Sequence, residues 1–177
     1  MERRPIPIEE FAVRADHIWR EQWLLLTAGD LSAHHFNTMT VGWGSFGHMW
    51  EKPFALVAVR PVRYTFGFME EYASFTLCAF PERYRGALRL LGTKSGRDGD
   101  KIAEAGLTVI PSLHVASPGF AEAELIVECR KIYYQDFDPL HFLAPGIEDH
   151  YPGKDYHRVY FGEIVAVQGT ARFRAAC

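Results

Sequence analysis

The spacing of apolar and polar residues along the chain predicts a molecule built mainly of β-strands. The clearest signal is the continuous apolar run over 54–59, which Pro53 opens and Arg60-Pro61 closes, as in a strand buried on both faces. A longer run over 120–134 alternates apolar residues with glutamates and an arginine, as in a strand with one buried face. Similar patterns predict further strands over 23–27, 36–41, 74–80 and 156–167.

Helical spacing is limited to three short stretches. Residues 82–91 place apolar side chains at helical intervals and end at Gly92, a favourable position for glycine just beyond a helix. Shorter helical turns are predicted over 64–71 and 98–105. Because strands and helices do not alternate regularly, the pattern favours a β-rich α+β domain with a closed or partly closed antiparallel barrel. No linker or repeat divides residues 1–177, so a single domain is expected.

Composition and charge argue against several function classes. Lys plus Arg number 19 and Asp plus Glu 22, a net charge of −3, so no general positive field is available for a nucleic-acid backbone. No apolar run approaches the ~18 residues of a membrane span, and the N-terminus lacks the apolar core of a signal peptide. Cys78, Cys129 and Cys177 form neither a CxxC pair nor an even-numbered framework. We expect a cytoplasmic protein without nucleic-acid or membrane partners, in which Cys78 and Cys129 are small buried hydrophobic residues.

The decapeptide 92–101 carries the most unusual chemistry in the sequence. Its three glycines allow backbone N–H groups to converge on an anion. Its hydroxyl and basic side chains are Thr93, Ser95, Lys94, Arg97 and Lys101. This combination suits a phosphate monoester, although the order of residues is not that of a Walker A loop. A solvated, charged connection between two helices is the alternative interpretation.

A second group of donors lies at residues 60–65. Arg60 and Arg63 flank Pro61 at the end of the apolar strand, and Thr65 is placed to cap the predicted helical turn. A helix N-terminus beside two arginines is also suited to an anion. Taken alone, the segment is better explained by a cap and two surface salt bridges, but two candidate anion sites in one small acidic protein support each other.

Residues 37–44 offer a surface for a planar ring. Trp43 lies between Gly42 and Gly44, so its indole provides an apolar wall while the neighbouring main chain stays accessible. A core tryptophan between two bulge glycines is the alternative. Residues 42–47 also match the letters of GxGxxG, but no helical pattern follows them.

The histidines and serines give no sign of a metal site or a hydrolase. His34 and His35 are adjacent and would face opposite sides of a strand, and the other histidines lack HxH or HExxH spacing. The sequence has no GxSxG motif. No metal is therefore predicted.

Together these segments resemble the flavin reductase-like family, whose members bind FMN on a split β-barrel and form homodimers. The resemblance covers about residues 37–167 and is strongest to the short flavoredoxin-like members. The matching motifs, in family order, are Asn37-Thr38-Met39-Thr40 with Trp43-Gly44, Lys52-Pro53, Arg60-Pro61-Val62-Arg63-Tyr64-Thr65, the loop over 92–101, Glu128-Cys129-Arg130-Lys131, and Asp155-Tyr156-His157 with Gly162-Glu163. The implied fold is an antiparallel Greek-key split β-barrel with a few short helices, its core at about 20–168.

The resemblance also implies roles for individual residues. The isoalloxazine ring would be lined by Asn37, Thr38, Met39, Thr40 and Trp43. The ribityl chain and phosphate would be approached by Arg60, Arg63 and Thr65, and the phosphate site completed by Thr93, Lys94, Ser95 and Lys101. His157 would lie near the nicotinamide or the flavin edge as the candidate catalytic residue, and either His157 or Lys52 would supply a cation beside the reduced ring.

The implied function is that of an FMN-dependent oxidoreductase, an NAD(P)H:flavin reductase that uses NADH or NADPH. Two alternatives stay open: a flavoredoxin-type carrier that exchanges electrons with a protein partner without NAD(P)H turnover, and a non-redox module for another phosphorylated ligand. A pyridoxal-phosphate site is disfavoured, because no lysine is expected in a buried apolar setting. The homodimer is implied by the resemblance alone.

Overall fold

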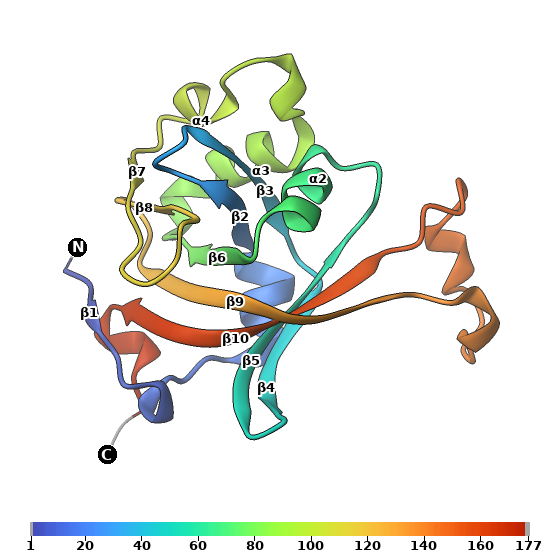
Figure 1. The fold of residues 1–177 in the computed structure, drawn as a ribbon, viewed down its shortest axis with the longest axis horizontal. Helices are drawn as coiled ribbons and strands as arrows, with labels where there is room; N and C mark the ends of the chain where they lie inside the picture. Colours follow the sequence, from blue (N-terminus) through green and yellow to red (C-terminus); the bar gives the residue numbers. More distant parts are fainter. Residues whose placement is uncertain (1, 176–177) are drawn as a thin grey trace.

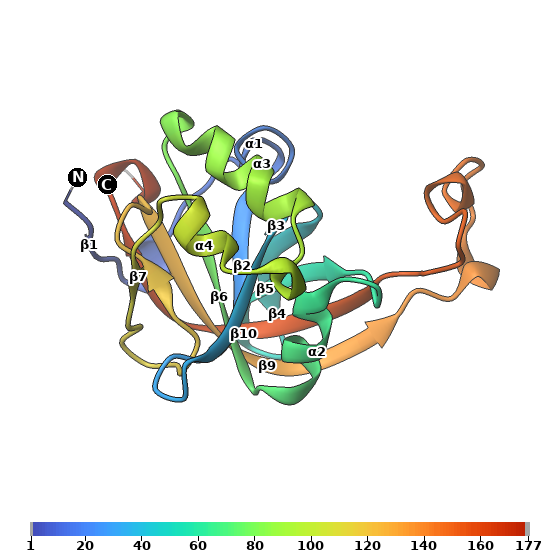
Figure 2. The same cartoon turned by 90° about the horizontal axis from the view of Figure 1, so that it is seen from above.

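The computed structural model describes residues 2–175 and shows a strongly twisted antiparallel sheet with short helices packed against it (Figures 1 and 2). Cys177, one of the three predicted free thiols, lies outside the described residues. The main sheet has the order β3-β2-β6-β9-β10-β5-β4, and β1 pairs with β10. The strands are β1 (Arg4–Pro5), β2 (Leu24–Asp30), β3 (His35–Val41), β4 (Gly44–Met49), β5 (Lys52–Val59), β6 (Ser74–Ala79), β9 (Leu125–Asp136) and β10 (Arg158–Gly169).

The sheet does not close into a continuous hydrogen-bonded barrel. Within the described chain, β3 pairs only with β2 and β4 only with β5, so each end strand keeps one free edge. All pairings are antiparallel, including that of the small separate sheet of β7 (Val109–Ile110) and β8 (Gly119–Phe120). The predicted split antiparallel barrel is confirmed.

Within residues 2–175, four short α-helices pack against the sheet: α1 (Ala15–His17), α2 (Tyr64–Glu71), α3 (Arg85–Thr93) and α4 (Lys101–Glu104). A π-helical turn (Ile18–Gln22) continues α1. Short 3-10 turns occupy Ile8–Glu10, Glu82–Tyr84, Gly96–Asp98, Pro139–His141, Glu148–His150 and Ala171–Phe173. Figure 2 shows α3 lying across one face of the sheet. Helix α3 runs one residue past the predicted stop at Gly92. A Cβ on Gly92 would lie 3.1 Å from Cβ of Thr40, so this glycine permits close packing of α3 on β3.

Two groups of buried side chains form the core. The larger fills the barrel and includes Leu24, Leu26, Val57, Phe75 and Val127. The smaller packs Leu88 and Leu91 of α3 against Leu25 and Cys78 on the outer face of the sheet. Cys78 and Cys129 are fully buried, as predicted, and burial raises the pKa of the Cys78 thiol to about 12. Neither thiol is therefore a reactive nucleophile.

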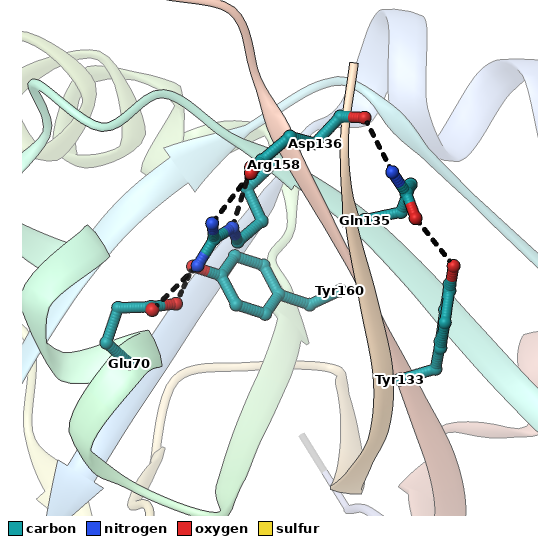
Figure 3. Close-up of polar contacts among 6 residues, drawn as sticks. All are labelled: Glu70, Tyr133, Gln135, Asp136, Arg158 and Tyr160. Atoms are coloured by element: carbon teal, nitrogen blue, oxygen red, sulfur yellow. Dashed lines mark hydrogen bonds and ion pairs between the residues drawn. The ribbon is translucent and has the colours of Figure 1, made fainter. Parts of the chain in front are cut away.

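A long arm, residues 137–157, connects β9 to β10 and projects away from the barrel (Figure 1). At its base, Arg158 donates hydrogen bonds to Asp136 and to Glu70 of α2, each at 2.7 Å (Figure 3). The hydroxyl of Tyr160 donates a further bond, at 2.6 Å, to Glu70. The bonds between Arg158 and Asp136 raise the pKa of Arg158 and lower that of Asp136, and burial, followed by the bond to Glu70, raises the pKa of Tyr160. The network fixes the C-terminal half of α2 on β10 and so orients the helix whose N-terminus enters the candidate site.

Candidate functional site

A cleft of about 140 Å³ lies where the N-terminus of α2 meets the loop between α3 and α4. Eleven residues line it: Asn37, residues 62–65, residues 93–97 and Lys101. The two segments that the sequence marked as separate anion sites, 60–65 and 92–101, therefore meet in one place. Of the predicted site residues, the cleft brings together Asn37, Arg63, Thr65, Thr93, Lys94, Ser95 and Lys101.

The charge of this cleft is unbalanced. Four of the eleven described lining residues are basic and none is acidic. Lys101 is only 3% exposed, and its Nζ donates to the carbonyl groups of Leu91 and Lys94 at 3.2 and 3.1 Å. Arg63 donates to the carbonyl group of Gly92. Among residues 2–175, neither cation forms an ion pair with a carboxylate.

Burial of these two cations carries an electrostatic cost. Desolvation, followed by repulsion from Arg63, lowers the pKa of Lys101 to about 8. Desolvation, followed by repulsion from Arg60, also lowers the pKa of Arg63. A bound anion would offset both effects, because an opposite charge nearby favours the protonated forms. Lys101 is buried, but hydroxyls and cations line the cleft beside it, so its setting is not the apolar pocket that a reactive pyridoxal-phosphate lysine would need.

Hydroxyl and amide groups complete the lining on the side of α2 and β3. Thr65 is 1% exposed and accepts a hydrogen bond from Nδ2 of Asn37 at 2.7 Å. The Ser95 hydroxyl accepts from the backbone N–H of Arg97 and caps the turn Gly96–Asp98. A Cβ on Gly96 would lie 2.3 Å from Oδ1 of Asn37, so only glycine allows this loop to approach β3 so closely.

The other cations of the cleft lie at its rim with partners of their own. Lys94 forms an ion pair with Glu104 of α4. The guanidinium group of Arg97 lies over the ring of Tyr64 at 4.6 Å from its centroid. The hydroxyl of Thr93 donates to the carbonyl group of Arg89 at 3.0 Å, within α3. We therefore expect Lys94, Arg97 and Thr93 to contribute less to binding an anion than Lys101 and Arg63.

The predicted ring-binding residues of β3 divide between its two faces. Thr38 is fully buried, hydrogen-bonded to the Thr27 hydroxyl, and Thr40 donates to the carbonyl group of Leu88 in α3. Met39 lies in the barrel core. Thr38 and Met39 are thus buried in the interior, and the half-buried Thr40 is committed to its hydrogen bond with α3. The free edge of β3 leaves main-chain groups, rather than side chains, as the polar surface along the strand.

Trp43 and His157 form a second part of the site, against the arm. Trp43 is 46% exposed, and its ring lies 4.8 Å from that of His157 and 5.5 Å from that of His150. Nδ1 of His157 is 2.8 Å from the hydroxyl of Tyr151. Burial, followed by repulsion from Arg60, lowers the pKa of His157 to about 4, so its imidazole is neutral at neutral pH.

Arg60 is turned toward the arm rather than into the cleft. Its guanidinium group pairs with Asp155 at 3.2 Å and donates to the carbonyl group of His150. It also lies over the Tyr151 ring, 5.2 Å from the centroid. Lys52 is remote from Arg60, at the opposite end of β5, where it pairs with Glu163 at 2.7 Å. Neither candidate for a cation beside the ring, Lys52 or His157, provides a free charge there.

Two lining residues, Val62 and Tyr64, received no role from the sequence. Both belong to the 60–65 motif, so motif membership alone could have identified them. Arg97 and the loop glycines were expected to help bind an anion, but the resemblance did not assign Arg97 or Gly96 to the phosphate site. The close approach of Gly96 to Asn37 depends on the fold and leaves no trace in local sequence.

Comparison with protein-family models identifies the family of the chain. The model of the flavin reductase like domain matches residues 21–174. The chain belongs to this family. A search of curated proteins found no match. None of the described helices is long and apolar enough to cross a membrane.

Solved structures with this fold include several flavin proteins. The flavoredoxin of Desulfovibrio vulgaris (Miyazaki F) is 21% identical, with a TM-score of 0.66 over 90% of this chain and 73% of that one. A flavoredoxin from Methanosarcina acetivorans is 23% identical, with a TM-score of 0.66 over 85% and 69%. The NADH:FAD oxidoreductase SgcE6 of Streptomyces globisporus C-1027 is 14% identical, with a TM-score of 0.64 over 85% and 76%. At these identities the likeness shows the shared fold.

Proposed function

We propose that this flavin reductase-like protein binds FMN and acts as an NAD(P)H-dependent flavin oxidoreductase. The observation that carries the proposal is the cleft in which the buried Lys101 and the half-buried Arg63 have no carboxylate partner among residues 2–175. Its size and charge suit one phosphate group, which carries about −1.5 to −2 charges at neutral pH. The N–H groups at the start of α2 and in the turn Gly96–Asp98 add further donors at this point.

The ring of the cofactor would lie along the free edge of β3, toward Trp43. Asn37 at the cleft and Gly42 before Trp43 are five residues apart, or roughly 17 Å at the rise of an extended strand. An extended ribityl chain with three fused rings can bridge such a span. Main-chain N–H and C=O groups on the free edge would bond the polar edge of the ring, and the exposed Trp43 would pack against its apolar part.

Bound FMN would supply the hydride chemistry. The protein's part is to hold and orient it. Lys101 and Arg63 would balance the phosphate charge, and Asn37, held by Thr65, would position the ribityl chain. His157, neutral and bonded to Tyr151, would form a wall of the ring site with Trp43 and exclude water there. With its low pKa, His157 is suited to accept a hydrogen bond rather than to donate a proton.

NADH or NADPH is proposed as the reductant on the basis of family membership. Stopped-flow mixing of the FMN-loaded protein with each nucleotide tests this, with bleaching of the visible flavin absorption as the expected result. Persistence of the oxidised spectrum with both nucleotides would instead establish a carrier that takes electrons from a protein partner. Protein that stays colourless after incubation with FMN would favour a non-redox module for another phosphorylated ligand.

A homodimer is also proposed, and the arm supports it. Leu140 and Leu143 are 86% and 95% exposed, and Tyr134 at the base of the arm is 57% exposed. Large apolar side chains on a projecting segment are typical of a surface that another chain covers. Replacing both leucines by serine should convert a dimer into a monomer in analytical ultracentrifugation. Wild-type protein that sediments as a monomer would contradict the proposal.

A further inference from the structure

Strand β9 extends beyond its neighbour β6 and leaves part of one edge without a partner strand. β6 pairs with β9 only as far as Arg130, and the N–H of Lys131 still donates to the carbonyl group of Ala73. From there to Asp136, β9 pairs only with β10 among the described strands. We propose that this open edge, residues 132–136, pairs with the same edge of a second copy of the chain, so that one sheet runs through both copies.

Main-chain groups of two residues point out of the open edge. The N–H of Phe137 donates to the carbonyl group of His157, toward β10, at 2.9 Å. Because successive residues of a strand direct their N–H and C=O groups to opposite sides, those of Asp136 and Tyr134 face away from β10. The Asp136 carbonyl accepts a long bond, at 3.3 Å, from the side-chain amide of Gln135 (Figure 3). A row of outward N–H and C=O groups is a template for another extended main chain.

A groove of about 740 Å³ lies beside the open edge and is the place that an added strand occupies. It is lined by residues 131–135 of β9 and by residues 70–73, at the C-terminal end of α2 and just after it. Tyr133 and Tyr134 are 43% and 57% exposed. Large aromatic side chains in contact with water beside an unpaired strand edge are typical of a surface that another chain covers.

The open edge is held in shape before any partner binds. Arg158 of β10 donates to the side chains of Asp136 and Glu70, each at 2.7 Å (Figure 3). Its guanidinium group also lies over the ring of Tyr134, 4.5 Å from the centroid. These contacts fix the last residues of β9 on β10 and on α2. A preformed edge reduces the ordering cost of adding a strand.

The order of charges along β9 favours a second copy as the partner. The strand is basic where the open edge begins, at Arg130 and Lys131, and acidic where it ends, at Asp136 and Asp138. A two-fold axis at Tyr134 makes the two strands antiparallel, so the basic end of each copy lies toward the acidic end of the other. The two Tyr134 residues then exchange both N–H···O bonds, with their Cα atoms about 5.5 Å apart.

The arm continues the same surface. It begins directly after the open edge and carries Leu140 and Leu143, which are 86% and 95% exposed. With Tyr134 on the axis, the arm of each copy leaves the edge beside Ala73 of the other copy, because Asp136 lies opposite Ile132. The inference rests on the homodimer proposed above and assigns the pairing in that dimer to the main chain of β9.

Amide hydrogen exchange of the wild-type protein, resolved by residue with NMR, tests the pairing directly. Measurements are made at protein concentrations above and below the dissociation constant of the dimer, which analytical ultracentrifugation supplies. The N–H groups of Tyr134 and Asp136 should exchange at least about tenfold more slowly in the dimer, because dissociation exposes the open edge. The N–H of Gln135, which faces β10, is the internal control and should exchange at a similar rate in both states.

The outcomes separate this inference from the proposed function. A dimer in which Tyr134 and Asp136 exchange as fast as in the monomer would overturn the edge pairing and leave the homodimer intact. Protein that sediments as a monomer at every concentration would overturn both. Fluorescence titration with FMN reports on the phosphate cleft by itself, so loss of FMN binding with protected edge amides would overturn only the flavin assignment.

A matched pair of variants at the centre of the edge separates main chain from side chain. Tyr134→Pro removes the N–H that the pairing needs and should raise the dissociation constant of the dimer at least about tenfold. Tyr134→Val keeps this N–H and removes only the ring, so the constant should rise less than about threefold. Equal dissociation constants for the two variants would contradict the edge pairing. If Tyr134→Pro does not fold, as judged by circular dichroism, the exchange rates of the wild-type protein decide the question.

Discussion

Lys101 and Arg63 face one cleft from different elements, α4 and the start of α2, and repulsion from Arg63 adds to burial in lowering the pKa of Lys101. Their only hydrogen-bond acceptors in the described chain are backbone carbonyl groups. Buried cations without an acidic partner are costly in a free protein and favourable once an anion binds. Substitution of Lys101 and changes of pH should therefore alter FMN binding directly.

Lys101→Ala should weaken FMN binding by roughly 10–100-fold, the value of one charge-assisted hydrogen bond. Lys154→Ala, on the exposed arm, is the matched control and should have no effect. Flavin fluorescence quenching measures both constants. If the dissociation constant for FMN is unchanged in Lys101→Ala, the phosphate does not bind in this cleft.

FMN affinity should also depend on pH through Lys101. Because the pKa of its amine in the free protein is about 8, the amine loses its proton above this pH, and binding of a dianion then requires proton uptake. The dissociation constant should therefore rise from pH 7 to pH 9. Lys101→Arg, which stays protonated, should bind FMN with little change over the same range. A parallel rise in both proteins would assign the pH dependence to another group.

Gly96→Ala tests the geometry of the loop. Its new methyl group would collide with Oδ1 of Asn37, so the loop must move away from β3 and FMN binding should weaken by at least about tenfold. Gly86→Ala is the control, since a Cβ in that helical position meets no atom within 4 Å. It should leave FMN binding unchanged and raise the free energy of unfolding by about 0.5–1 kcal/mol. Similar binding by both variants would contradict the close approach of the loop.

Arg60 and Arg63 should differ in their effects although they are only three residues apart. Arg63→Ala should reduce FMN affinity strongly, whereas Arg60→Ala should mainly release the arm, whose Asp155 and His150 it holds. Limited proteolysis within residues 137–157 should accelerate in Arg60→Ala and not in Arg63→Ala. If Arg60→Ala and Arg63→Ala lose FMN affinity equally, Arg60 contacts the ribityl chain or phosphate, as the sequence resemblance implies.

His157 should make the protein less stable in mild acid. Its folded pKa of about 4 lies below the ordinary value of 6.5, so the unfolded chain binds the proton more readily between these two values. The free energy of unfolding should therefore fall by on the order of 1–2 kcal/mol from pH 7 to pH 5 through this residue. Urea titrations should show a smaller fall for His157→Phe than for wild type, while His48→Phe, an exposed control, should match wild type.

The sequence predicted the apolar strands of the sheet well, but it predicted strands and strand ends that contain glycine less well. The run Ala28-Gly29-Asp30 resembles a turn, yet β2 continues through Asp30. A Cβ on Gly29 would lie 2.3 Å from Cα of Phe36, so this glycine allows two strands to approach closely. Strand β4 was missed because its two glycines and its exposed end hide the alternation of an edge strand.

The polar face predicted for residues 120–134 is partly wrong. Glu128 is fully buried, and it accepts hydrogen bonds from the backbone N–H groups of Leu113 and His114 at 2.9 and 2.7 Å. The carboxylate thereby organises a loop that lies 14 residues away in sequence. Local alternation indicates which side chains share a face, but only the fold decides whether a loop covers that face.

In the candidate site, too, local chemistry was predictable from the sequence, whereas the contacts made in the fold were not. Residue types in 60–65 and 92–101 were sufficient to predict two groups of anion donors, because their chemistry is local. The directions of individual side chains were not predictable, since Arg60 is drawn to Asp155 and Thr38 to Thr27 by contacts that form only in the folded chain.

The central claim is that the cleft between α2 and the 93–101 loop holds the phosphate of FMN. Comparing FMN with riboflavin, which lacks that phosphate, tests it most directly. Fluorescence titrations should give at least about 100-fold tighter binding of FMN to the wild-type protein, and a preference of less than about tenfold in the double variant Arg63→Ala/Lys101→Ala. Equal affinity of the wild-type protein for the two flavins would contradict the claim.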